Sequence, residues 1–208
     1  MISGYIEPEI EIRRKIAPVK EKMGFPAYSP DKPSIQEEYS FEPITMDKIV
    51  KNEQDYIIVG ESGIGKTSFL YWTASQIASK NIISGVIPLF LPLKDIAIIN
   101  TRNDLFSLLD TRYSLAEHDL SKNQLLFLLD GLDQTPNYGN ILNRLRNKDI
   151  FGKENRIILT TRPIGYEWIK YSFGYEYLRL IPFDEEELVL RLSALASRMG
   201  ETHQLLKR

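Results

Sequence analysis

The sequence predicts an α/β fold in which a five-stranded parallel sheet lies between two layers of helices. From Gln54 onward, short apolar runs alternate with segments of helical length, as in a parallel sheet covered by helices. Most of these runs are continuously apolar, which is typical of strands buried on both faces. Because 208 residues exceed one average domain, we expect one such domain with shorter segments attached to it.

Five apolar runs are the expected strands: Tyr56–Val59, Val86–Leu91, Leu125–Leu129, Arg156–Thr161 and Tyr177–Ile181. Three segments between them have helical length: Lys66–Lys80, Asp104–Tyr113 and Tyr138–Asn147. The second strand contains Pro88 and is followed by Pro92, and proline has no N–H group for a sheet hydrogen bond. We therefore expect this strand at an edge of the sheet.

The two ends of the chain differ from this central pattern. Residues 1–43 hold six of the 11 prolines, which prevents a long helix and predicts an extended N-terminal arm that packs on, or links to, another part. Near the C-terminus, Asp184 and Glu187 can cap a helix whose apolar face is formed by Leu188, Leu192, Leu195 and Met199. We expect a proline-rich arm in 1–43, the α/β domain in 44–183, and the start of a truncated helical module in 184–208.

Composition and charge exclude several classes of protein. The 26 basic residues are balanced by 28 acidic ones, which argues against a protein built around nucleic-acid binding. Cysteine is absent, so disulfides, thiolate zinc sites and cysteine nucleophiles are excluded. The longest nearly apolar run, Ile82–Leu93, contains two prolines and is shorter than the roughly 20 residues that cross a bilayer. The acidic N-terminus is unlike a signal peptide, so we expect a cytoplasmic protein without membrane association.

The strongest motif is Gly60-Glu-Ser-Gly-Ile-Gly-Lys-Thr, which matches the P-loop pattern G-x-x-x-x-G-K-[ST] between an expected strand and an expected helix. Its glycines let backbone N–H groups surround a phosphate. Lys66 brings a positive charge to the outer phosphates, and Thr67 offers a hydroxyl to Mg²⁺ at the start of the helix. We expect the whole loop to bind the phosphates: Gly60, Glu61, Ser62, Gly63, Ile64, Gly65, Lys66, Thr67 and Ser68.

Two further motifs end strands at the sheet edge where this loop lies. The run Leu125–Leu129 leads into Asp130, and an acid after a buried strand is how P-loop enzymes hold Mg²⁺ through water. Asp133 follows three residues later, where it can polarise a water for attack on the terminal phosphate. Thr161 and Arg162 should emerge at the same edge, where the guanidinium can contact the terminal phosphate or report its loss.

In this order and spacing, the three motifs resemble those of the NACHT family, a branch of the signal-transducing STAND ATPases. The proline-bearing strand Ile87-Pro-Leu-Phe-Leu-Pro-Leu also looks like that family, and the resemblance covers residues 44–190. It implies that the strand Arg156–Thr161 lies between the P-loop strand and the acidic strand. It also implies ATP and Mg²⁺ as cofactors, and a switch in which the nucleotide state gates self-association or the binding of an effector or sensor protein.

The resemblance also implies roles for single residues. Lys66 and Thr67 bind phosphate and Mg²⁺, and Asp130 is the Walker B acid that holds the metal. Asp133 is the catalytic acid, and Arg162 is the sensor of the terminal phosphate. Lys66, Asp133 and Arg162 are therefore the expected catalytic residues, and Thr67 and Asp130 the expected metal ligands.

The chain departs from the family at Gln134, where members usually have Glu. Glutamine can orient a water but is a poor proton acceptor, so we expect slow hydrolysis. Two alternatives stay open: a nucleotide-dependent interaction module that does not hydrolyse, and a P-loop phosphotransferase acting on a small molecule. The modules that close over the nucleotide in the family would lie beyond Arg208, so we expect the core of a longer protein or a truncated member.

Two assignments concern the base of the nucleotide. The stretch Glu42–Met46 is a candidate for the adenine pocket by its position just upstream of the first strand. Asn147-Lys-Asp resembles the guanine-reading N-K-x-D, but Ile150 stands where the specifying Asp is needed, which disfavours GTP.

Overall fold

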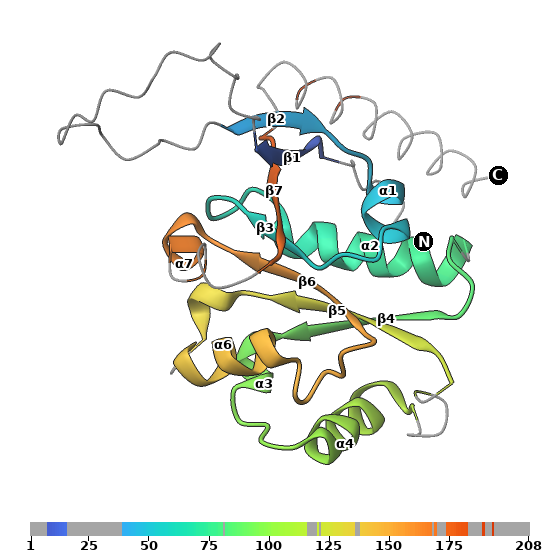
Figure 1. The fold of residues 1–208 in the computed structure, drawn as a ribbon. Coiled ribbons are helices and arrows are strands. Elements are labelled where there is room, and N and C mark those ends of the chain that lie inside the picture. Colours follow the sequence, from blue (N-terminus) through green and yellow to red (C-terminus); the bar gives the residue numbers. More distant parts are fainter. Residues whose placement is uncertain are drawn as a thin grey trace, which may run out of the picture.

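A seven-stranded sheet with helices on both faces forms the body of the protein (Figure 1). The computed structural model describes residues 8–15, 39–80, 82–115, 120, 122–135, 138–167, 169, 174–182, 189 and 193. The strands are β1 (Ile10–Lys15), β2 (Tyr39–Pro43), β3 (Tyr56–Val59), β4 (Val86–Pro92), β5 (Gln124–Asp130), β6 (Arg156–Thr161) and β7 (Glu176–Leu180). Their order across the sheet is β2-β1-β7-β3-β6-β5-β4.

The α/β fold and its parallel sheet are confirmed. All five expected strands are present as β3 to β7, and each pair of neighbours among them is parallel. β6 lies between β3 and β5, as the family resemblance implies. β4, with Pro88 and Pro92, is the edge strand on one side, as expected, and an edge strand is where a sheet tolerates proline.

The expected number of five strands is wrong, because two more come from the proline-rich segment. β1 pairs antiparallel with β7 on one side and with β2 on the other. Its alternate residues Ile10 and Ile12 are buried in the core, because successive side chains of a strand point to opposite faces of the sheet. The nearby prolines do not interrupt this pattern, since Pro8 precedes β1 and Pro43 ends β2. The remainder of the expected arm lies outside the described residues.

Helices connect the strands as the alternation predicts. They are α1 (Met46–Lys51), α2 (Lys66–Lys80), α3 (Leu93–Ile96), α4 (Arg102–Tyr113), α6 (Tyr138–Asn147), α7 (Pro163–Glu167) and the 3-10 helix η1 (Leu132–Gln134). α4 begins two residues earlier than expected, because Thr101 and Asp104 form a reciprocal capping box. The expected helix after Asp184 lies outside the described residues, apart from the helical positions Val189 and Ser193.

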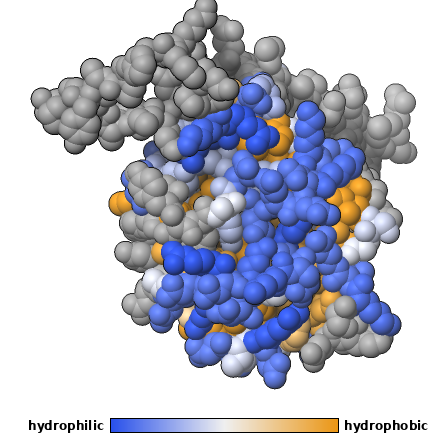
Figure 2. All heavy atoms as spheres, in the orientation of Figure 1, coloured by the Kyte–Doolittle hydropathy of each residue, from blue (hydrophilic) through white to orange (hydrophobic). Residues whose placement is uncertain are grey.

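Two apolar clusters, one on each face of the sheet, hold the layers together. Ile57 and Val59 of β3 face one cluster with residues of α3, α4 and α6. Tyr56 and Ile58 face the other with residues of α1 and α2. Burial on both faces explains why the strand sequences are continuously apolar. Hydrophilic residues make up most of the coloured surface in Figure 2.

None of the helices in the described ranges is long and apolar enough to cross a membrane.

Candidate functional site

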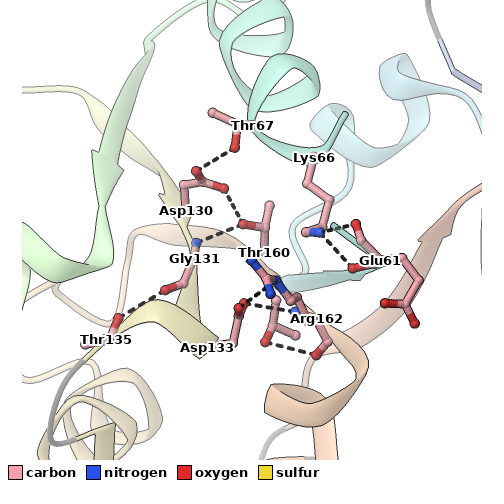
Figure 3. Close-up of polar contacts among 11 residues, drawn as sticks. Glu61, Lys66, Thr67, Asp130, Gly131, Asp133, Thr135, Thr160 and Arg162 are labelled. Carbon is pink, nitrogen blue, oxygen red and sulfur yellow. Dashed lines mark hydrogen bonds and ion pairs between the residues drawn. The ribbon is translucent and has the colours of Figure 1, made fainter. Parts of the chain in front are cut away.

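The carboxyl ends of β3, β5 and β6 open onto one cavity of about 270 Å³ (Figure 3). The cavity is lined by Ser62, Gly63, Gly65, Lys66, Thr67, Ser68, Asp130, Gly131, Asp133, Gln134, Thr160 and Arg162. These residues come from all three sequence motifs. In an open α/β sheet, the crevice beyond the carboxyl ends of the strands is where ligands bind.

The loop from β3 to α2 turns through two glycines with positive φ. Gly63 has a φ of 82° and Gly65 a φ of 99°, a region that residues with a Cβ rarely adopt. α2 begins directly after them at Lys66, and its first turn holds no acidic residue. The partial positive charge of the helix N-terminus is therefore available to an anion in the cavity.

The Lys66 ammonium lies across the loop. Its Nζ donates hydrogen bonds to the carbonyl oxygens of Gly60, at 2.7 Å, and Glu61, at 2.8 Å. Partial burial lowers the pKa of Lys66 below its ordinary value, and the positive charge of Arg162 acts in the same direction. The carboxylates of Asp133 and Asp130 act in the opposite direction, so the cavity holds charges of both signs close to this ammonium.

Asp130, the last residue of β5, accepts a hydrogen bond at each carboxylate oxygen. The Thr67 hydroxyl donates to Oδ2 at 2.7 Å, which links the P-loop helix to the acidic strand. The Thr160 hydroxyl donates to Oδ1 at 2.5 Å, and the same hydroxyl accepts from the backbone N–H of Gly131 at 3.0 Å. Asp130 is thus held between β6 and the start of α2 (Figure 3).

Asp133 of η1 forms a two-point contact with Arg162. Arg162 donates its backbone N–H to Oδ1 at 3.0 Å, and its Nε lies 3.1 Å from Oδ2. The Asp133 side chain is only 6% exposed, whereas that of Arg162 is 42% exposed. The Asp133 carboxylate is therefore held by the backbone N–H and Nε of Arg162, while part of the Arg162 guanidinium remains open to the cavity.

Most of the predicted site residues line the cavity. Ser62, Gly63, Gly65, Lys66, Thr67, Ser68, Asp130, Asp133 and Arg162 all do so. Gly60, Glu61 and Ile64 do not line it. Gly60 and Glu61 instead provide the carbonyls that Lys66 contacts, and Ile64 packs against the apolar cluster under α1 and α2.

Thr161 ends β6 at the same edge as the P-loop, as expected, since its carbonyl accepts a hydrogen bond from the backbone N–H of Gly60 at 3.2 Å. The residue of β6 that lines the cavity is Thr160 instead. Successive side chains of a strand point to opposite faces, and the Thr161 hydroxyl contacts the Arg162 carbonyl at 3.2 Å. Sequence reasoning also missed Gly131 and Gln134 as lining residues. In the register of β5 and β6, Leu128 is opposite Ile158, so continuing the pairing by two residues leads from Asp130 to Thr160.

The candidate adenine pocket and the candidate guanine motif lie in different parts of the structure. Pro43, Ile44 and Thr45 line a separate hollow of about 450 Å³ together with residues 8–11. Lys148, in the candidate guanine motif, directly follows the last residue of α6, and its ammonium contacts Asp55 at 2.8 Å; neither residue lines the cavity. The motif therefore stands at the end of a helix.

Comparisons with known proteins agree with the motifs. The model of the NACHT domain family matches residues 54–196. No curated protein matches the chain in sequence.

Among solved structures, the chain is similar to the ORC1 protein of Aeropyrum pernix in complex with DNA, with 16% identity over 73% of this chain and 46% of that one, and a TM-score of 0.48. The ORC2 protein of Aeropyrum pernix, in ADPNP-ADP complexes, has 14% identity over 71% and 49%, with a TM-score of 0.49. A RuvB mutant of Thermotoga maritima has 15% identity over 74% and 47%, with a TM-score of 0.43. The chain spans about half the length of these structures.

Proposed function

The chain belongs to the NACHT family of P-loop NTPases, and from this premise we propose that it is an Mg²⁺-dependent switch that binds ATP and hydrolyses it slowly. Its nucleotide state would govern self-association or the binding of an effector or sensor protein. The observation that carries the proposal is the convergence of Lys66, Asp130 and Arg162 on one cavity from three separate segments.

The residues of the cavity fit a nucleotide phosphate. Gly63 and Gly65 leave the loop without side chains at the two positions that need positive φ, and the start of α2 adds its partial positive charge. Lys66 would hold the outer phosphates as a compact positive charge. Its present partners are two loop carbonyls, which a phosphate oxygen outcompetes because it carries a full charge.

The residues also fit Mg²⁺, which prefers oxygen ligands and retains several waters. Thr67 and Asp130 would hold it, since their oxygens are already 2.7 Å apart. Bound there, the ion would neutralise charge on the phosphates.

Asp133 and Arg162 would act at the terminal phosphate. Asp133 would orient the attacking water and accept its proton, while the exposed part of the Arg162 guanidinium would bind the phosphate oxygens. In the structure both carboxylate oxygens of Asp133 contact Arg162, so engaging a water requires Asp133 to exchange or share one of these contacts, while the exposed part of the guanidinium stays available to a phosphate. This requirement, together with the neutral Gln134 beside Asp133, supports slow turnover.

We infer adenine as the base, held near Glu42–Met46. The backbone pairings Val59–Arg179, Arg179–Glu11 and Glu11–Pro43 form one row across four strands. Gly60 follows Val59 directly, so the hollow beside Pro43 and Ile44 lies at the same edge of the sheet as the P-loop.

Binding of a fluorescent ATP analogue in the presence of MgCl₂ tests the site. Lys66→Ala should weaken affinity at least tenfold, because the loop loses its only side-chain cation. Lys153→Ala, which removes an exposed lysine just before β6, at the opposite edge of the sheet, should not change it. Equal affinities of wild type and Lys66→Ala would show that the site is assigned wrongly.

Phosphate release separates the enzyme from the non-hydrolysing module that Gln134 also suggests. Slow turnover that disappears in Asp133→Asn supports the enzyme, and the absence of turnover in a wild type that binds ATP supports the module.

Measuring molar mass in solution with ATP and with ADP then tests whether the nucleotide gates self-association. A cytoplasmic location remains a prediction from the sequence.

A further inference from the structure

Thr160 connects β6 to the end of β5 in the site, although the sequence motifs did not single it out. Thr160 is fully buried in β6, with an exposed fraction of 0%. Its hydroxyl nevertheless makes two hydrogen bonds, to Asp130 Oδ1 at 2.5 Å and with the Gly131 backbone N–H at 3.0 Å. One buried side chain therefore contacts both the acidic residue and the peptide that follows it.

The chemistry of these groups determines the direction of each hydrogen bond. The Gly131 N–H can only donate, so the Thr160 oxygen must accept from it. The hydroxyl proton is then free to point at Asp130, whose ionised carboxylate can only accept. Every polar atom in the contact is used, which makes it unlike an incidental buried threonine.

The consequence for Asp130 is a fixed carboxylate. Oδ1 is held by a residue of β6 that packs between β3 and β5, and Oδ2 faces the Thr67 hydroxyl. Without Thr160, the carboxylate could rotate about its terminal torsion, which has broad minima. The Gly131 N–H, which is buried, would also lose its acceptor.

We propose that Thr160 is a positioning residue: its hydroxyl orients the Asp130 carboxylate so that Oδ2 faces Thr67 and the cavity, and thereby sets the affinity for the Mg²⁺ that accompanies the nucleotide. This inference rests on the proposed function. Thr160 acts through Asp130, because its hydroxyl is already hydrogen-bonded to Asp130 and to the Gly131 N–H. Partners that orient a metal-binding side chain in this way typically change metal affinity or activity by about 10- to 100-fold when they are mutated.

The test compares three single variants of the full chain. Thr160→Val has nearly the same shape but no hydroxyl, and Thr160→Ser keeps the hydroxyl. Thr161→Val is the matched control, because Thr161 is the next residue of β6 with the same exposed fraction of 0%, and its hydroxyl contacts the Arg162 carbonyl instead. Affinity for a fluorescent ATP analogue is measured first in EDTA and then across a MgCl₂ titration.

We expect Thr160→Val to bind the analogue in EDTA as wild type does, since the P-loop is intact. Its MgCl₂ midpoint should rise about 10- to 100-fold, while Thr160→Ser and Thr161→Val stay within about threefold of wild type. If Thr160→Val does not fold, Thr160→Cys replaces it, because a thiol is only a weak donor and should also raise the midpoint.

Two results would overturn the inference: an unchanged midpoint in the Thr160 variant that lacks a good donor, or an equal rise in Thr161→Val. A wild type that binds no analogue in MgCl₂ would instead refute the proposed function itself. The two failures are therefore distinguishable in the same titration.

Discussion

Replacing Gly165 of α7 with alanine is the substitution for which the structure gives the clearest magnitude. Gly165 is buried against β6 and η1, and a Cβ added there would lie 2.1 Å from Thr161 Oγ1 and 3.3 Å from Asp133 Cβ. Real Cβ atoms essentially never come within 3.0 Å of another heavy atom, so something must move. Thr161 cannot swing away, because it is fully buried and β-branched, with a restricted χ1.

The clash must therefore be relieved by a displacement of α7. Overpacking of this kind typically costs about 1–3 kcal/mol. For a chain of this size, about 1 kcal/mol shifts Tm by roughly 2–4 °C, so we expect a Tm lower by about 2–12 °C. Displacing α7 also pulls on Arg162, one residue before the helix, whose backbone N–H donates to Asp133. Phosphate release should therefore fall more than binding of the ATP analogue.

Thermal unfolding followed by circular dichroism measures the loss. Gly139→Ala is the matched control, since Gly139 is also helical, in α6, but a Cβ there would meet nothing within 4 Å. That variant should gain about 0.4–1 kcal/mol from reduced freedom of the unfolded chain. In the double variant Gly165→Ala/Thr161→Ala the clashing oxygen is gone, so its destabilisation should be less than the sum of the two single ones. A Gly165→Ala protein as stable as wild type, or stabilised like Gly139→Ala, would refute the steric reasoning.

Two further stability changes follow from the described residues. Thr73→Val should raise the free energy of unfolding by about 1 kcal/mol, because the Thr73 hydroxyl is buried in α2 without a hydrogen-bond partner in the described part of the chain. A lower Tm of this variant in thermal unfolding would contradict the prediction. Lys148→Ala should lower the free energy of unfolding by about 1–3 kcal/mol, because Asp55, whose side chain is 15% exposed, loses an ammonium at 2.8 Å. Urea unfolding at neutral pH measures the loss, and an unchanged midpoint would show that the ion pair does not contribute to stability.

Local patterns in the sequence were enough to predict the central part of the sheet. Most of the five runs that became β3 to β7 are apolar on both faces, and this can be recognised without knowing which strand pairs with which. The P-loop was predicted for a similar reason, since its glycine spacing is a requirement of the local backbone. Gly63 and Gly65 indeed carry the positive φ values.

Pairings between distant segments could not be predicted in this way. β1 is a strand because it lies beside β7, more than 160 residues later in the chain, and its polar residues and flanking prolines weaken any local signal. The side of β6 that faces the cavity depends on its register with β5, so the motif alone did not distinguish Thr160 from Thr161. The contact of Asp133 with Arg162 depends on η1 and α7 packing together.

The amino-acid sequence by itself determined the type of fold and the chemistry of the site, because glycine spacing, strand-ending acids and apolar runs act on their immediate neighbours. Only the tertiary structure decided which oxygen of Asp130 is held by Thr160, and that Arg162 contacts Asp133. These contacts join residues about 30 positions apart, and their geometry exists only after the strands have paired.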